Sequence, residues 1–315
     1  MRSTRRAVLG ASLLGVALAL AACGSSGSST AADNPGPDQL AQIEARGVLV
    51  LATDPAYPPQ SYLVATAKRP TTTKCTESQW TGNQIAGYDA DVSKLVAQKL
   101  GVESCFVAPT WAEMTSGHWQ SQWDIAFASI GITRDRMKGL YYTQPYSAEG
   151  ERFYVRTTSP YTRVEQLSGK RLGGCTNCAA QYYIQRTLDL PGQAVTFHVH
   201  DATFVGYDVE SNGLAAVAHG KLTAFLCGVA VGQKAIKQGL ALRQLGGNQY
   251  LPYIAGAVDR SSGLNPGPFM TKVDTIVRQL QLDGTLRARS LHYFGIDFAT
   301  PAVGFDLASL GQDKP

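Results

Sequence analysis

Short apolar runs alternate with longer amphipathic stretches along this chain, a pattern that predicts an α/β fold. Val48–Ala52 is a continuous apolar run, as in a strand that is buried on both faces. Apolar residues at positions 92, 95, 96 and 100 share one helical face, and Gly101 ends that helix. Further strands are predicted at 106–108, 124–129, 171–174, 195–199 and 222–226, and further helices at 111–122, 179–188, 213–219, 273–280 and just before Gly295.

The alternation of strands and helices runs through once and then restarts, which predicts two α/β lobes, mostly parallel sheets and an interlobe ligand cleft. In such sheets a ligand binds outside the carboxyl ends of the strands. Those ends are the loops at 53–60, 109–112, 130–136, 175–180 and 227–230. The predicted division is 38–150 with 253–300 for lobe 1, 151–252 for lobe 2 and 301–315 for a C-terminal tail. Hinges are expected near 148–156 and 248–256, where the chain crosses between the lobes.

The composition is that of a globular chain, since 44% of the 315 residues are apolar and 17% are charged. The formal net charge of +4 falls by three to +1 if Arg2, Arg5 and Arg6 are cleaved off, so no nucleic-acid partner is expected. Beyond the N-terminal segment, no apolar run of the sequence reaches the roughly 18 residues of a membrane-spanning helix.

Residues 1–22 have the pattern of a signal peptide, with basic residues before an apolar run that ends in small residues. The ending Leu-Ala-Ala-Cys23 resembles the bacterial lipobox, which implies cleavage before Cys23 and a diacylglycerol on its sulfur. Arg5 and Arg6 resemble a twin-arginine signal, so the export route, Sec or twin-arginine, stays open. Residues 23–37 are rich in Gly, Ser and Ala and predict a flexible tether. The body is therefore expected outside the cytoplasm, anchored to the cell membrane through Cys23.

Once Cys23 is lipidated, an odd number of cysteines is left, so at least one thiol is free or pairs outside the chain. These are Cys75, Cys105, Cys175, Cys178 and Cys227, and their pairing stays open. The spacing of Cys175 and Cys178 is that of a redox site, but the lack of a thioredoxin-like context favours a structural disulfide or buried thiols. The candidate zinc partners, His198 and His200, fall in a predicted strand, so neither a metal nor a cofactor is expected.

Six motifs follow one another between about residues 40 and 298. They are Thr-Asp-Pro-Ala-Tyr-Pro-Pro at 53–59, Gly-Tyr-Asp-Ala-Asp-Val at 87–92, Trp111 with Gly117 and Asp124, Ser-Ile-Gly-Ile-Thr-Arg-Asp-Arg at 129–136, Leu-Ser-Gly-Lys at 167–170, and Asp-Gly-Thr-Leu to Tyr-Phe-Gly at 283–295. In this order they resemble the extracytoplasmic solute-binding proteins of amino-acid ABC importers, bacterial family 3. The resemblance implies a type II periplasmic-binding fold and a monomer that delivers a small solute to an ABC permease and its ATPase.

The resemblance also implies a site for a ligand carboxylate. Arg136 matches the family's carboxylate-binding Arg, and its guanidinium offers the paired N–H donors that a carboxylate prefers. Gly131 and Thr133 can complete the shell with backbone groups and a hydroxyl. Tyr57 and Trp111 match positions at which family members stack a wall on the ligand.

The resemblance also implies that two further loops line the site, although their side chains match the family less well. Asp54 matches a position that can face the ligand side chain, although a role in capping the Pro-rich turn competes with it. Cys178 and Ala179 replace two hydroxyl residues of the family's second-lobe carboxylate loop, so only their backbone N–H groups remain as donors.

One departure concerns the ligand's α-ammonium group. Residue 228 is Gly, where the family usually has an Asp that pairs with this ammonium. A buried ammonium without a carboxylate partner is costly. Either another acid moves in, with Asp208 and Glu210 best placed to do so, or the ligand lacks an α-ammonium.

The resulting hypothesis is a lipid-anchored solute-binding protein that captures a small, polar, carboxylate-bearing solute, above all an amino acid. A ligand sensor shares every binding feature and stays open as an alternative. A same-fold enzyme, similar to cyclohexadienyl dehydratase, would need an acid–base group in the cleft, and no His occupies a motif position, so no enzyme is expected. A redox protein built on Cys175 and Cys178 is the remaining alternative.

Overall fold

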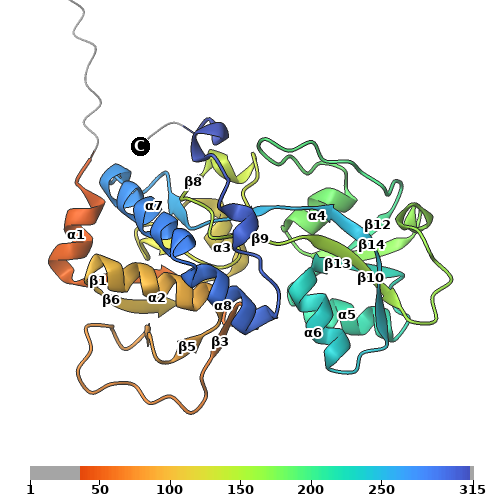
Figure 1. Cartoon of the computed structure of the whole chain (residues 1–315), viewed down its shortest axis with the longest axis horizontal. Helices are drawn as coiled ribbons and strands as arrows, with labels where there is room; N and C mark the ends of the chain where they lie inside the picture. The colour runs from red at the N-terminus through yellow and green to blue at the C-terminus, as the bar shows by residue number, and fades with distance from the viewer. Residues whose placement is uncertain (1–35, 313–315) are drawn as a thin grey trace, which may run out of the picture. The chain divides into compact units, whose positions relative to one another are not determined.

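The computed structural model describes residues 36–312, which belong to one compact unit of the chain (Figure 1). Two lobes, each built on its own α/β sheet, make up this part of the protein. The predicted α/β class with two lobes is confirmed. The prediction of mostly parallel sheets is wrong, since both sheets mix parallel with antiparallel strand pairs.

The first sheet has six strands, and parallel pairs join its β1 to β6 and β7. Its strand order is β4 (Trp80–Thr81), β6 (Glu103–Val107), β1 (Val48–Ala52), β7 (Ile125–Ala126), β16 (Ala257–Asp259) and β8 (Leu140–Tyr142). The helices of this lobe are α1 (Gln39–Arg46), α2 (Tyr88–Leu100), α3 (Trp111–Ser116), α7 (Gly267–Leu282) and α8 (Thr285–Phe294). As its apolar run predicts, β1 is buried along nearly its whole length.

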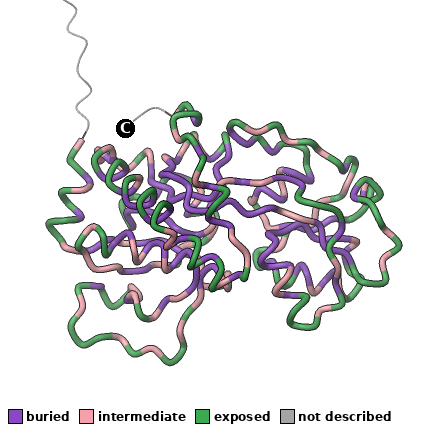
Figure 2. The backbone as a smooth tube through the Cα atoms, in the orientation of Figure 1, coloured by how far each residue is buried: buried purple, intermediate pink, exposed green. Residues whose placement is uncertain are grey.

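The second sheet has five strands, of which β10 and β13 run antiparallel while β11 pairs parallel with both β12 and β13. Its order is β12 (Thr203–Tyr207), β11 (Arg171–Cys175), β13 (Ala224–Gly228), β10 (Glu151–Arg156) and β14 (Leu242–Tyr250). The helices of this lobe are α4 (Ala179–Ile184), α5 (Glu210–Ala218) and α6 (Val229–Lys237). In both lobes the buried stretches follow the strands and the inner faces of the helices (Figure 2).

The chain passes between the lobes through two short strands that lie side by side. β9 (Ser147–Ala148) and β15 (Tyr253–Ile254) pair antiparallel, with Tyr253 opposite Ala148. A small three-stranded sheet comprises β2 (Ala56–Tyr57), β3 (Ser61–Leu63) and β5 (Ile85–Ala86). Short 3-10 helices are η1 (Arg136–Lys138), η2 (Val164–Leu167), η3 (Thr300–Ala302) and η4 (Leu307–Leu310).

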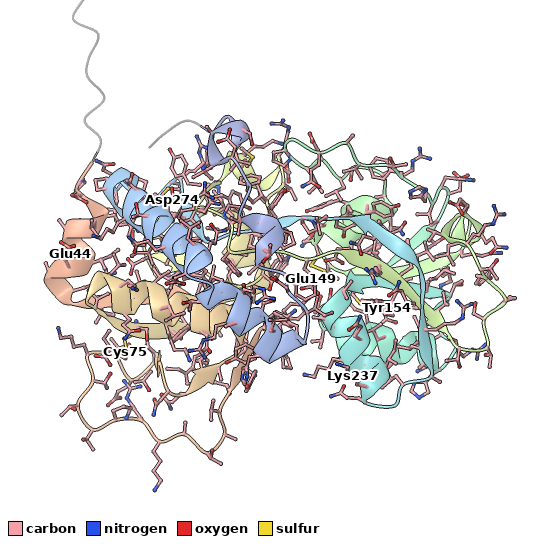
Figure 3. All side chains as sticks on the ribbon, in the orientation of Figure 1. Glu44, Cys75, Glu149, Tyr154, Lys237 and Asp274 are labelled. Atoms are coloured by element: carbon pink, nitrogen blue, oxygen red, sulfur yellow. A yellow bond between two sulfur atoms is a disulfide. The ribbon has the colours of Figure 1, made fainter. Side chains whose placement is uncertain are left out.

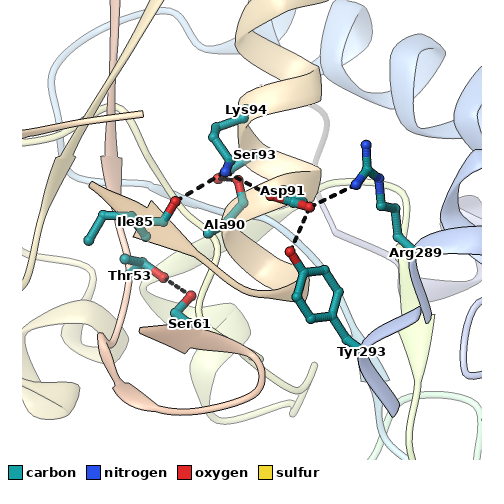
Figure 4. A network of polar contacts seen from close by, with 9 residues as sticks. All are labelled: Thr53, Ser61, Ile85, Ala90, Asp91, Ser93, Lys94, Arg289 and Tyr293. Carbon is teal, nitrogen blue, oxygen red and sulfur yellow. Dashed lines mark hydrogen bonds and ion pairs between the residues drawn. The ribbon is translucent and has the colours of Figure 1, made fainter. Parts of the chain in front are cut away.

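Two motifs from opposite ends of the sequence meet at Asp91 in α2. The Asp91 carboxylate accepts a hydrogen bond of 2.8 Å from the Tyr293 hydroxyl and one of 3.2 Å from the Arg289 guanidinium, both on α8 (Figure 4). Lys94, one helical turn along, lies 2.7 Å from the other carboxylate oxygen. These contacts explain how the C-terminal Tyr-Phe-Gly segment is held against the first lobe.

Several predicted elements are wrong in type or extent. The strand predicted at 124–129 is formed only by Ile125–Ala126. Residues 195–199 form no strand, because the backbone there bonds to a side chain: the His198 N–H donates to the Tyr183 hydroxyl at 3.0 Å. The helix predicted at 111–122 ends at Ser116, since Gly117 takes a left-handed conformation with φ of 68°. The helix predicted at 179–188 ends at Ile184, and Arg186 just beyond it has a φ of 63°.

The structure answers the open question of cysteine pairing. Cys75 pairs with Cys105, which ties the polar loop after β3 to β6, and Cys175 pairs with Cys178. Cys227 is a buried free thiol. Among residues 36–312, every helix is too short or too polar to cross a bilayer.

Candidate functional site

Arg136 is buried, with 7% of its surface exposed, and its guanidinium is held by backbone carbonyls. One terminal nitrogen donates to Gly131 O at 2.9 Å and the other to Asn177 O at 3.1 Å. The guanidinium carbon lies 5.0 Å from the centre of the Trp111 ring, a cation–π distance. These bonds use two of the five N–H donors of an arginine, so donors remain for a ligand.

Asn177, in the second lobe, accepts hydrogen bonds from both Arg136 and Trp111 of the first lobe. The bond from Trp111 Nε1 to its carbonyl is 3.1 Å long. Asn177 lies between the disulfide-bonded Cys175 and Cys178 and has a φ of 58°. The predicted site residues Cys178 and Ala179 follow directly, at the start of α4, so they lie beside the carbonyl that Arg136 contacts.

The buried carboxyl group of Asp89 anchors the loop that leads to Arg136. Asp89 accepts hydrogen bonds from the Ser129 hydroxyl at 2.7 Å and the Tyr146 hydroxyl at 2.8 Å. Ser129 has a φ of 52°, a left-handed turn that redirects the chain toward Gly131. Burial raises the pKa of Asp89 to about 7, although both hydroxyl bonds lower it.

Thr133 is buried, and its hydroxyl oxygen accepts a 3.2 Å hydrogen bond from the Arg136 N–H. This contact fixes the start of η1 and thereby the origin of the Arg136 side chain. Gly131 serves through its carbonyl, which faces the guanidinium. Both residues thus contact Arg136 directly, as neighbours of the group that was predicted to bind a carboxylate.

Asp54 and Tyr57 occupy the Pro-rich turn after β1. The Asp54 carboxylate accepts a 2.9 Å bond from the Ala56 N–H, and the Tyr57 N–H donates to the Asp54 carbonyl at 3.2 Å. Asp54 therefore caps this turn, the competing role that the sequence allowed. Tyr57 packs its ring against apolar residues of the second lobe.

Of the acids that surround Tyr57, sequence reasoning named Glu210 as a substitute acid but missed Glu149 and Glu151. Glu149 and Glu151 flank Gly150 just after β9, and Glu210 opens α5. Glu149 and Glu210 are only 6% and 8% exposed (Glu149 is labelled in Figure 3). Asp208, proposed from the sequence as a substitute acid, is exposed and lies outside this group.

Glu149 lies where the missing Asp side chain at residue 228 would start. A Cβ atom added to Gly228 would meet Glu149 Oε1 at 2.8 Å. The same oxygen accepts a 2.6 Å hydrogen bond from the Ala230 N–H, in the first turn of α6. The carboxyl group is thus present at this point of the fold, supplied by a different residue.

The three glutamates interact with one another and resist ionisation. Burial raises the pKa of Glu210 to about 8; a hydrogen bond from the Tyr57 hydroxyl lowers it, and the charges of Glu149 and Asp54 add to the rise. Burial, followed by the charges of Glu210 and Glu149, raises the pKa of Glu151 well above its usual range. Burial also raises the pKa of Glu149 to about 7, although the Ala230 N–H lowers it. We call Glu149, Glu151 and Glu210 the acid cluster.

Several polar atoms around the acid cluster have no hydrogen-bond partner within residues 36–312. These are Glu151 Oε2, Glu210 Oε2 and the Tyr250 hydroxyl. The Gln60 side chain, by contrast, bonds to Glu149 and lowers its pKa. Buried polar groups in proteins are nearly always satisfied, so unpaired ones point to a bound species. Burial raises the pKa of Tyr250, and charges at both ends of the site also act on it, since Glu151 raises this pKa while Arg136 lowers it.

The sequence profile of the bacterial extracellular solute-binding proteins, family 3, matches residues 49–296. The chain belongs to this family, and its fold is the two-lobed type II periplasmic-binding fold.

Individual relatives are distant. The L-cystine-binding protein TcyJ of Escherichia coli (strain K12) is 21% identical over 272 residues, covering 82% of this chain and 86% of its own. Cyclohexadienyl dehydratase of Pseudomonas aeruginosa is 28% identical over 113 residues, or 36% of each chain. The crystal structure of Tv2483 bound to L-arginine superposes with a TM-score of 0.69 at 14% identity, covering 85% of this chain and 100% of that one. This chain is therefore similar to binding proteins and, over a shorter stretch, to an enzyme.

The raised pKa values predict how stability depends on pH. Between about pH 4.5 and about pH 8, folded Glu149 and Glu210 hold protons that the unfolded chain has released, so the free energy of unfolding falls as pH rises. The variant Glu149→Gln/Glu210→Gln should lose this slope and become more stable than wild type above pH 8 by over about 2 kcal/mol. Urea unfolding of the ligand-free proteins at several pH values measures the difference.

Asp208→Asn is the matched control, since it removes an exposed acid near Glu210 and should leave the slope unchanged. Parallel curves for wild type and the Gln variant would contradict the burial of these acids. Asp89 and Asp274, whose pKa values are also raised by burial, contribute equally to all three proteins.

Proposed function

We propose that this protein captures an α-amino acid outside the cytoplasm and delivers it to an ABC importer. The observation that carries the proposal is the pair of opposite charges in the site. Arg136 offers a buried guanidinium, and Glu149 places a carboxyl group beside Gly228. An α-amino acid carries the two complementary groups, a carboxylate and an ammonium.

Arg136 binds the ligand carboxylate. A carboxylate is a stronger acceptor for a guanidinium than a backbone carbonyl, so it takes the place of the Asn177 carbonyl. Trp111 holds the guanidinium plane from one side, which favours a bidentate pair. The backbone N–H groups of Cys178 and Ala179 adjoin this point and complete the shell from the second lobe.

Glu149 binds the α-ammonium in place of the Asp that the family usually has at residue 228. The approach of a cation favours the charged form of Glu149, which burial otherwise disfavours. Tyr57, packed against the second lobe, forms the wall along the ligand. Because residues of both lobes contact the bound amino acid, binding draws the lobes together about the crossing strands β9 and β15.

The protein works as a monomer with a permease and its ATPase, and it binds its ligand without chemical change. A same-fold enzyme is the second candidate, because a buried carboxyl such as Glu210 has the raised pKa that a general acid needs. Mass spectrometry of a bound amino acid after prolonged incubation decides between them, since a binding protein returns it unchanged.

The lipid anchor is part of the proposal and rests on the sequence, since Cys23 lies outside the described residues. Cys23→Ala should move the protein from the membrane fraction to the soluble extracytoplasmic fraction, because it removes the sulfur that would carry the lipid. Fractionation of cells with an immunoblot measures this, and an unchanged membrane fraction would count against the anchor.

The carboxylate site is tested by substituting Arg136. Arg136→Lys keeps the charge but loses the planar fork, and Arg136→Ala loses both, so affinity for amino acids should fall by about 30-fold or more in each. Isothermal titration of the mature body with an amino-acid panel measures the loss. Arg134→Ala is the control, since Arg134 is an exposed neighbour 3.6 Å from Asp189. Folding is checked by thermal melting, and full affinity in folded Arg136→Lys and Arg136→Ala would refute the assignment.

A carboxylate swap tests the ammonium site. Glu149→Ala should cost about 30-fold or more in affinity, because the ammonium is left without a partner. Gly228→Asp alone should also bind poorly, since its side chain starts within 2.8 Å of Glu149 Oε1. The double variant Glu149→Ala/Gly228→Asp moves the carboxylate to residue 228 and should recover most of the affinity. If the double variant is as weak as Glu149→Ala, Glu149 does not replace the missing Asp.

A further inference from the structure

The acid cluster contains more carboxyl groups than one ammonium needs. Glu149 suffices for the α-ammonium in the proposed function, on which this inference rests. Glu151 and Glu210 are then left over. Strand register places Glu151 opposite both Gly228 of β13 and Tyr250 of β14, so it adjoins the proposed ammonium site.

The described part of the chain supplies no cation for these acids. Within residues 36–312, none of the ion pairs involves Glu149, Glu151 or Glu210. Lys234 donates to the Pro58 carbonyl, and Arg136 to carbonyls of Gly131 and Asn177. The Ala230 N–H donates to Glu149 and the Tyr57 hydroxyl to Glu210, but these hydrogen bonds bring no positive charge to the acids. Buried carboxylates are normally balanced by a cation, so a cationic ligand would complete the arrangement.

The unpaired atoms specify the chemistry of what binds. Glu151 Oε2 and Glu210 Oε2 are acceptors, and the hydroxyl of Tyr250, which is 6% exposed, adds a polar atom that lacks a partner in the described part of the chain. The ring of Tyr57 lies beside the same acids. Burial, followed by the charges of these acids, raises the pKa of its hydroxyl. Negatively charged hydrogen-bond acceptors beside aromatic faces suit a second cation that carries several N–H donors.

We propose that the ligand is an α-amino acid with a positively charged side chain, whose terminal guanidinium or ammonium is bound by Glu151 and Glu210. A neutral side chain of the same length leaves both carboxyl groups without a partner. Sites built to bond a specific group reject analogues that lack it much more strongly than apolar pockets reject a missing methylene.

The same geometry couples binding to proton release. The groups that face Glu151 and Glu210 from the surrounding elements are Glu149, Asp54, Tyr57, Cys227 and Tyr250. Asp54 and Glu149 are acids, and the tyrosines and the thiol are neutral at neutral pH, so protons are what neutralises the empty cluster. An incoming cation displaces them, and its affinity should rise from pH 6 to pH 8.

The test compares charged ligands with neutral isosteres by isothermal titration at pH 8. L-Arginine is paired with L-citrulline, and L-lysine with L-norleucine. Each cationic member should bind about 30-fold or more tightly than its neutral partner. Glu151→Gln and Glu210→Gln should each reduce that ratio by about 10-fold or more, whereas Asp208→Asn should leave it unchanged. Arginine titrations in two buffers of different ionisation enthalpy should show protons released.

Failure of this inference is distinct from failure of the proposed function. If neutral α-amino acids bind as tightly as their charged partners, the protein is an amino-acid binder and the second cation site is refuted. If no α-amino acid binds at any pH, the proposed function itself is refuted. Two separate variants keep the test sound, since Glu151→Gln remains informative if Glu210→Gln does not fold.

Discussion

The space beside residue 228 is the constraint on which the rest of the site depends. Glu149 Oε1 accepts a hydrogen bond from the first turn of α6, and a Cβ at residue 228 would lie 2.8 Å from that oxygen. Only a residue without a side chain leaves room there for the carboxyl group. Glycine at residue 228 and glutamate at residue 149 are thus two halves of one arrangement. In the proposed site, the acid that is missing at residue 228 is therefore supplied by residue 149.

The opposite end of the site is organised by carbonyl groups. Arg136 is buried, yet its partners Gly131 and Asn177 offer only backbone oxygens, which are weaker acceptors than a carboxylate. A guanidinium with neutral partners and spare donors keeps its affinity for an anion. The shared Asn177 carbonyl also joins Trp111 and Arg136 of the first lobe to a loop of the second. Both ends of the site are therefore built from both lobes.

The sequence predicted most of the first lobe and singled out Arg136 as a candidate site residue, because both depend on local patterns. Val48–Ala52 and the apolar face of α2 follow from spacing alone, and Arg136 follows from a contiguous motif. The acid cluster could not be predicted in this way. Glu151 meets Gly228 only through the antiparallel register of β10 on β13, which brings together residues far apart in the sequence. The sequence does show Glu149 and Glu151 at an expected hinge, but their role cannot be inferred until that strand register is known.

Protons explain how the acid cluster is compatible with a folded protein that holds no ligand. Three ionised carboxylates at this spacing would repel one another in a region with little water, at a cost that few domains can offset. Raised pKa values of about 7 and about 8 leave Glu149 about half protonated and Glu210 mostly protonated at pH 7, so the empty site contains less negative charge than three ionised carboxylates. In the proposed function, a ligand cation then replaces bound protons rather than filling a bare charged cavity. The release of these protons makes the free energy of binding smaller than it would be for preformed carboxylates, so the proposed ligand would also be released more readily.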